Sequence, residues 1–196
     1  MRGFMKLYKY RNFNDLRFLL DIFLNNRLYA AEYTEMNDPM EGHYLVKPGV
    51  INTRTKELIK DEKDTVRIVS LSADSDNQLM WAHYADGHKG LAIEVEIVDE
   101  YSELKEVKYQ GLSELTHLAE RDPLETAKHI LSHKHEFWEY ENEFRVLTRH
   151  RKFVSVVVTK VIFGCKVLDD DCQFYRELLL KLSPNLQFEK ATKQFT

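Results

Sequence analysis

Residues 141–164, ENEFRVLTRHRKFVSVVVTKVIFG, predict three strands in succession. We expect them at 141–149, 153–158 and 160–164, where valine, isoleucine and phenylalanine recur. No helical pattern separates these strands. Strands that occur in clusters, instead of alternating strictly with helices, favour an α+β fold over a doubly wound one.

Other elements are predicted on both sides of this run. We expect strands at 6–11, 27–33, 66–72, 90–97, 104–109 and 186–191. We expect helices at 14–26, 53–64, 77–86 and 169–182, and helical patterns over 112–138 that break near Asp122-Pro123. No repeat or linker divides the chain, so residues 1–196 are predicted to form a single compact α+β domain. Helices would flank either one mixed, mainly antiparallel sheet or two small packed sheets.

Composition narrows the class of protein. The chain has 196 residues and a formal net charge of -4, so it has no strong nucleic-acid footprint. It has no apolar run of the ~18 residues that a membrane span needs, and its first residues lack an apolar signal core. Cys165 and Cys172 are the two cysteines, and a reduced pair is favoured over a disulfide. We therefore expect a cytoplasmic protein with no membrane partner.

Two candidate sites lie in the first quarter of the chain. Tyr8, Tyr10 and Arg11 end the first strand. An arginine there is either a surface strand end or a planar fork that binds a phosphate or carboxylate. The second site is the turn NDPMEG at 37–42. Side chains such as Asn37 and Asp38 shape turns by bonding to their own backbone, while Glu41 can project into a cleft.

A third candidate site follows the strand at 66–72. Ser70 and Ser72 share one face of that strand, because strand side chains alternate, and their hydroxyls need partners. The helix and turn that follow carry several polar-tipped rings, at Trp81, His83, Tyr84 and His88. These residues form either a core polar network or a ligand pocket, and we expect mainly a pocket wall. The spacing of His83 and His88 does not suit zinc, so no metal site is predicted.

The fourth candidate site is a run of carboxylates. Glu139, Glu141 and Glu143 would share one face if the chain were extended there. They form either a solvated strand edge or a buried group whose repulsion raises at least one pKa, opposed by a nearby cation such as Arg11, Arg145 or Arg149. Because that repulsion would be relieved, Glu143→Gln is expected to abolish any activity while changing stability little or even raising it.

These segments together resemble the bacterial proteins of domain-of-unknown-function family 2971. The resemblance covers nearly the whole chain, and the middle block is its most specific part. It rests on LYKYR at 7–11, NDPMEG at 37–42, SLS at 70–72, LMWAHYADGHKGLAIEVE at 79–96, VKY at 107–109, WEYENEFR at 138–145 and VIFG at 161–164.

A second resemblance suggests a chemistry. Mono-ADP-ribosyltransferases carry an Arg or His on an early strand, a Ser-x-Ser strand end and a Glu-x-Glu before a later strand. Arg11, Ser70 with Ser72, and Glu141 with Glu143 are similar in type and order. The resemblance implies NAD as a substrate, Glu143 as the ribose-binding carboxylate, Glu141 on the side of an acceptor macromolecule, and Arg11 on the pyrophosphate. A bacterial toxin or defence effector would fit such an activity.

Two other functions stay open. The histidines and carboxylates would also suit an enzyme that processes phosphoesters or nucleic acid. His129 and His133 are expected on one helix, where a solvated face is favoured over a metal site. A non-catalytic module that binds a small anionic ligand or a nucleotide is the third possibility.

Overall fold

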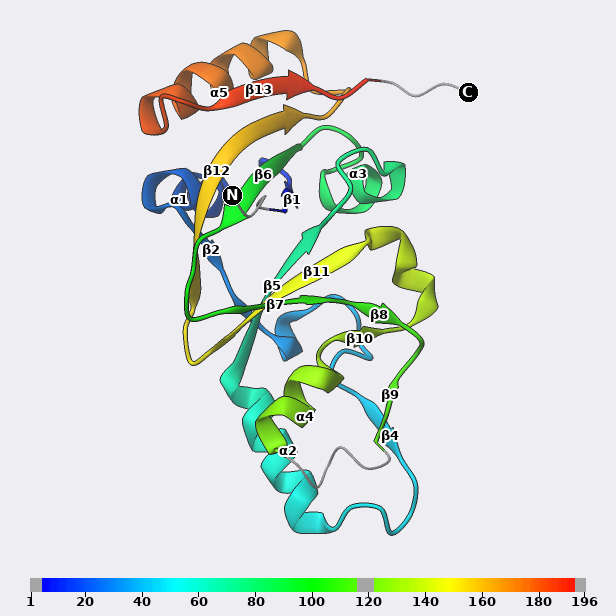
Figure 1. Ribbon diagram of the computed structural model, residues 1–196. Coiled ribbons are helices and arrows are strands. Elements are labelled where there is room, and N and C mark those ends of the chain that lie inside the picture. Colours follow the sequence, from blue (N-terminus) through cyan, green and yellow to red (C-terminus); the bar gives the residue numbers. More distant parts are fainter. Residues whose placement is uncertain (1–4, 116–121, 193–196) are drawn as a thin grey trace.

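The computed structural model describes residues 5–115 and 122–192. Within these ranges one sheet of nine strands runs through the molecule (Figure 1). Seven strands follow one another in the order β13-β12-β6-β1-β5-β11-β7. They are β13 (Gln187–Lys190), β12 (Phe153–Phe163), β6 (Leu91–Ile97), β1 (Leu7–Arg11), β5 (Val66–Ser72), β11 (Glu143–Arg149) and β7 (Glu103–Glu106). β2 (Arg27–Tyr29) adds to β12, and β3 (Ala31–Glu32) adds to β5.

Most neighbours in this sheet are antiparallel, and β13 is parallel to β12. Two small parallel sheets pair β4 (Tyr44–Val46) with β9 (Ser113–Leu115) and β8 (Lys108–Tyr109) with β10 (His133–Lys134). The prediction of a single compact α+β domain is confirmed, with a mixed, mainly antiparallel main sheet.

Helices cover both faces of the main sheet. They are α1 (Leu16–Asn25), α2 (Thr53–Thr65), α3 (Gln78–Tyr84), α4 (Pro123–Ile130) and α5 (Asp169–Leu182), with the 3-10 helices η1 (Tyr33–Glu35) and η3 (Glu136–Glu141). α1 and α5 pack on the face that bears Leu91 and Ile93 of β6. α3 packs on the face that bears Ala92, because successive strand residues point to opposite faces. α2 and α4 lie together at the other end of the molecule (Figure 1).

Several predicted strand boundaries were wrong. The strand expected at 104–109 is divided into β7 and β8, which belong to different sheets. The strands expected at 153–158 and 160–164 are one strand, β12, whose register against β6 shifts between Val158 and Lys160. Thr159 lies at this irregularity and donates a hydrogen bond to Glu94, so its hydroxyl is satisfied within the strand. The strand expected at 27–33 is divided instead, because β2 and β3 pair with different strands.

The helical prediction for 112–138 was also largely wrong. The chain forms β9 first, and residues 116–121 lie outside the described part. α4 begins with Pro123 at its first turn, after Asp122 caps it by accepting from the main-chain N–H of Leu124. β10 and η3 follow α4. The helical prediction, which rested on local helix propensity, was therefore too long on both sides of α4.

Candidate functional site

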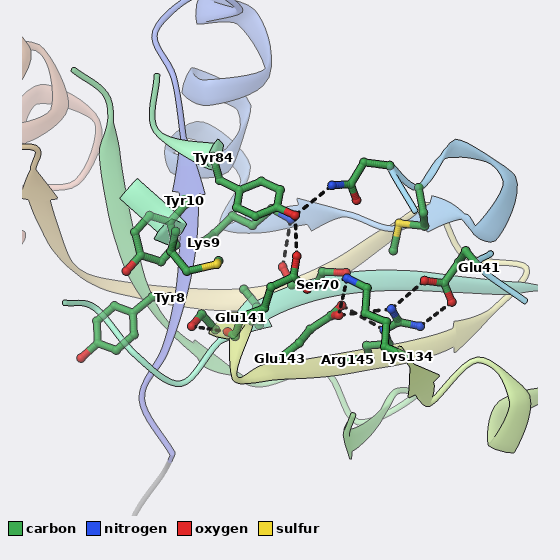
Figure 2. A pocket seen from close by; sticks show the side chains of 15 residues that line it. Tyr8, Lys9, Tyr10, Glu41, Ser70, Tyr84, Lys134, Glu141, Glu143 and Arg145 are labelled. Atoms are coloured by element: carbon green, nitrogen blue, oxygen red, sulfur yellow. Dashed lines mark hydrogen bonds and ion pairs between the residues drawn. The ribbon is translucent and has the colours of Figure 1, made fainter. Parts of the chain in front are cut away.

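The candidate site lies where β1 meets β5. These two strands are paired only at Tyr8 and Ser72 in their recorded register. On the other side of β5, Glu143 of β11 lies opposite Ser72, and Arg145 lies opposite Ser70. A cavity of about 80 Å³ opens here (Figure 2). It is lined by Tyr8, Lys9, Tyr10, Met36, Asn37, Glu41, Ser70, Leu71, Ser72, Met80, Tyr84, Lys134, Glu141, Glu143 and Arg145.

A sharp change of backbone direction brings two glutamates into this pocket. Glu141 ends η3, and Asn142 adopts a left-handed conformation with φ 43° before β11 begins at Glu143. Asparagine tolerates this conformation better than most residues. The prediction that Glu139, Glu141 and Glu143 share one face of an extended segment was therefore wrong. Glu139 is exposed, whereas the other two are only 4% and 3% exposed.

Arg145 joins two of the pocket carboxylates. Its side chain is completely buried, and its Nη1 and Nη2 donate to the two oxygens of Glu41 at 2.7 and 2.8 Å. Its Nε and Nη2 donate to the oxygens of Glu143 at 2.9 and 3.2 Å. Nη1 also donates to the main-chain oxygen of Leu131 at 2.5 Å. This guanidinium is thus held in place by charge-assisted hydrogen bonds on each side.

Lys134 joins Glu143 to the remaining carboxylate. Its Nζ lies 2.5 Å from Glu141 and 3.2 Å from Glu143. The carboxylates of Glu41, Glu141 and Glu143 thus face two paired cations, Lys134 and Arg145. When all five are ionised, this cluster has one excess negative charge.

The two neighbouring glutamates have opposite pKa shifts. Burial raises the pKa of Glu141, and Glu143 adds to the effect, while Lys134 opposes it. Burial also acts to raise the pKa of Glu143, but Arg145 and Lys134 outweigh it and hold the pKa at about 2. The prediction that at least one pKa is raised is confirmed. Of the cations expected nearby, Arg145 lowers the pKa of Glu143 together with Lys134, whereas the expectation for Arg11 was wrong.

α3 contributes the tyrosine that contacts Glu141. Asn77 caps this helix by accepting from the main-chain N–H groups of Leu79 and Met80. The helix then carries Tyr84 over the pocket, where its hydroxyl donates to Glu141 at 2.5 Å and accepts from Asn37 at 2.8 Å (Figure 2). The hydrogen bond from Tyr84 favours the ionised form of Glu141 and partly offsets the effect of burial.

The rings of the 77–97 segment are divided between core and surface. Trp81 is 1% exposed, and its indole N–H donates to the main-chain oxygen of Ser75, so it belongs to the core. His88 is half-buried and stacks on Trp81. His83 is exposed, with its Nδ1 3.0 Å from the hydroxyl of Tyr140. The expected pocket wall is thus formed by Tyr84 and not by these three rings.

Most of the other residues predicted from sequence meet in the pocket. Those that line it are Tyr8, Tyr10, Asn37, Glu41, Ser70, Ser72, Tyr84, Glu141 and Glu143. Asp38 is outside it, and its carboxylate accepts from the main-chain N–H of Met40 and so shapes the turn. Arg11 is also outside the lining, and within the described residues its buried Nε has no hydrogen-bond partner.

Three cations of the pocket were not predicted as ligand-binding residues. Arg145 could have been recognised, since it shares a strand face with Glu143. Lys134 lies on a two-residue strand that gives no periodic signal. Lys9 alternates with Tyr8 and Tyr10, so an ordinary strand would place it on the opposite face. Its Nζ nevertheless donates to the main-chain oxygen of Ser70 at 2.9 Å.

The histidines of the 129–133 segment do not lie on one helix. α4 ends at Ile130, and His133 belongs to β10. The Nδ1 of His133 lies 2.7 Å from the main-chain oxygen of His129, and both rings are half-buried. No group of three or more His, Cys, Asp or Glu residues in the described ranges could hold a metal ion.

Two further observations concern the setting of the protein. Cys165 and Cys172 are both free thiols, in agreement with the expected reduced pair. Across residues 5–115 and 122–192, every helix is too short or too polar to cross a membrane.

Comparisons with family models, curated proteins and solved structures found no match to the chain. The resemblances seen in the sequence therefore stay predictions.

Proposed function

We propose that this protein is an enzyme that consumes NAD and releases or transfers its ADP-ribose group. The supporting observation is the order of strands in the main sheet. β1, β5 and β11 carry the three segments that are similar to mono-ADP-ribosyltransferases, and they are neighbours in the sheet. Residues from each, among them Tyr8, Ser72 and Glu143, line one pocket.

The two glutamates suit different parts of this reaction. Cleavage of the nicotinamide–ribose bond builds positive charge on the ribose, which a nearby carboxylate stabilises. Glu143 is the better candidate for this part, because its pKa of about 2 keeps it ionised. Glu141 has a raised pKa and so holds a proton more readily, which suits a group that accepts a proton from the attacking molecule.

Charge and size favour the nicotinamide end of NAD inside the pocket. The nicotinamide ring of NAD is positively charged, and the buried cluster has one excess carboxylate. A cavity of about 80 Å³ is well below the ~300–1,000 Å³ typical of drug-sized ligands, so most of the dinucleotide would lie outside it. Arg11 is kept as the candidate for the pyrophosphate on its sequence position alone.

The test is release of nicotinamide from millimolar NAD, measured by chromatography. Wild-type protein is expected to release it, and Glu141→Gln is expected to lower the rate at least tenfold. Glu139→Gln is the matched control, because Glu139 lies in the same helix but is exposed. The proposal is wrong if NAD is neither turned over nor able to raise the melting temperature of the wild-type protein.

One observation favours a second candidate, a module that binds a nucleotide without reaction. Both carboxylate oxygens of Glu143 already have partners, Arg145 on each and Lys134 on one. A carboxylate held in this way is rigid and less available to a developing positive charge. This candidate predicts that NAD raises the melting temperature while no nicotinamide appears over many hours.

A further inference from the structure

Two lysines line the same pocket in different environments. Lys134 forms ion pairs with Glu141 and Glu143, and their charges raise its pKa although burial acts to lower it. Lys9 has no ion pair among the described residues, and its one hydrogen bond there goes to the main-chain oxygen of Ser70. Lys9 is therefore an amine without a fixed counter-ion inside a pocket.

Burial and a neighbouring charge act on this amine. Burial lowers the pKa of Lys9 to about 7, and Arg11 adds to the effect, while Glu143 and Glu141 oppose it. At pH 7 a much larger fraction of the molecules then carries a neutral amine than for an ordinary lysine of pKa ~10.4, where it is well below a tenth of a percent. The neutral amine is the nucleophilic form, and lysines activated by burial form Schiff bases with carbonyl compounds.

The other walls of the pocket suit a neutral carbonyl compound. With Glu141 protonated, the charges of Glu41 and Glu143 balance those of Lys134 and Arg145, so no excess cation attracts a small anion. Glu141 lines the same cavity, and burial favours its protonated form, which can donate a proton. A cavity of about 80 Å³ is well below the ~300–1,000 Å³ typical of sites for drug-sized ligands, so the compound must be small.

We propose that Lys9 is a nucleophilic amine that binds a small neutral aldehyde or ketone as an imine. The lone pair of Nζ forms a bond to the carbonyl carbon, and the carbonyl oxygen takes a proton from Glu141 to give a carbinolamine. One proton then moves from the nitrogen to the hydroxyl group, which leaves as water, and the nitrogen loses its remaining proton to Glu141. Amine and carbonyl thus give imine and water, with no other reactant. This proposal goes beyond NAD consumption and does not depend on it.

The experiment treats the whole wild-type chain with limiting propionaldehyde and sodium cyanoborohydride at pH 7. The reductant converts an imine to a stable secondary amine, which peptide mass spectrometry assigns to single lysines. Lys9 is expected to react at least tenfold faster than the exposed Lys89 and faster than Lys134. Without cyanoborohydride the peptide that contains Lys9 should keep its mass, because the imine hydrolyses during preparation.

The outcome separates the proposal from its alternatives. Equal or slower labelling of Lys9 relative to Lys89 overturns it, and so does faster labelling of Lys134. Lys9→Arg should remove one fast-reacting site and leave the rate at Lys89 unchanged. Because the main comparison uses the wild-type chain, it holds even if this variant does not fold. The NAD assay can fail while Lys9 still reacts, and the reverse is equally possible, so the two proposals are tested independently.

Discussion

Glu143→Gln is expected to lower the free energy of unfolding by about 3 kcal/mol at neutral pH. The ion pairs with Arg145 and Lys134 lower the pKa of Glu143 from its ordinary 4.5 to about 2. One pH unit of pKa difference corresponds to about 1.4 kcal/mol, so the ionised side chain stabilises the fold by about 3 kcal/mol. A loss of stability of similar size, ~3–5 kcal/mol, is expected when one partner of a buried ion pair is removed. The sequence alone suggested little change, because repulsion between the carboxylates was expected to outweigh attraction to nearby cations.

The measurement is urea unfolding at pH 7, with thermal unfolding as a second readout. For a chain of this length, about 3 kcal/mol corresponds to a melting temperature lower by roughly 6–12 °C. Glu139→Gln makes the same chemical change on an exposed side chain and is expected to stay within about 0.5 kcal/mol of wild type. If Glu143→Gln also stays within 1 kcal/mol, the ion pairs do not stabilise the fold as argued.

The pH dependence of this difference has a definite sign. Some carboxyl groups have a lower pKa in the folded than in the unfolded state. Such a group stabilises the fold fully when the pH is above its pKa in the unfolded state. This stabilisation is lost as the pH falls through the pKa of the group in the folded state. For Glu143 that window runs from about 4.5 down to about 2. The free energies of unfolding of wild type and Glu143→Gln should therefore differ by the same amount at pH 6 and pH 7. They should converge below pH 4. A difference that grows on acidification would contradict the assigned direction.

Three other substitutions test separate contacts. Glu141→Gln is expected to lower the melting temperature by less than half as much as Glu143→Gln, because burial raises the pKa of Glu141. Gly90→Ala is expected to cost about 1–3 kcal/mol in urea unfolding, since a Cβ there would overlap the main-chain oxygen of Arg11. Asn77→Ala is expected to cost about 1 kcal/mol in thermal unfolding, because its side chain caps α3. Equal effects of the two glutamates, or unchanged stability of the other variants, would contradict these contacts.

Long periodic segments could be predicted from the sequence because their signals are local. α5 and β5 lie at the residues expected, since acidic residues begin the first and valine and isoleucine dominate the second. The predicted boundaries of strands were wrong where contacts with distant parts of the chain decide them. β12 continues through Thr159 because Glu94 on the neighbouring strand satisfies its hydroxyl. No local pattern carries that information.

The sequence predicted most of the residues that line the candidate site, but it did not predict how their charges are balanced. Glu41, Ser72, Tyr84 and Glu143 come from four distant segments, and all of them line the pocket. The sequence showed that carboxylates would be close together and named Arg145 among the cations expected near them, but it did not show Lys134. Lys134 in particular lies on a short strand whose place is set by pairing with β8. Such residues give no periodic signal, so their role appears only in three dimensions.

Burial of charge alone does not mark this site, as Glu94 shows. Glu94 is 2% exposed, and hydrogen bonds from Tyr8 and Thr159 satisfy its carboxylate, yet it does not line the cavity. A paired carboxylate of this kind has a structural role. Glu141 differs because it shares its cation with Glu143, keeps a raised pKa and lines a cavity. Apolar residues of similar volume would often stabilise such a position equally well. Stability alone therefore does not explain why charged groups remain here, whereas the proposed binding or reaction of a ligand would.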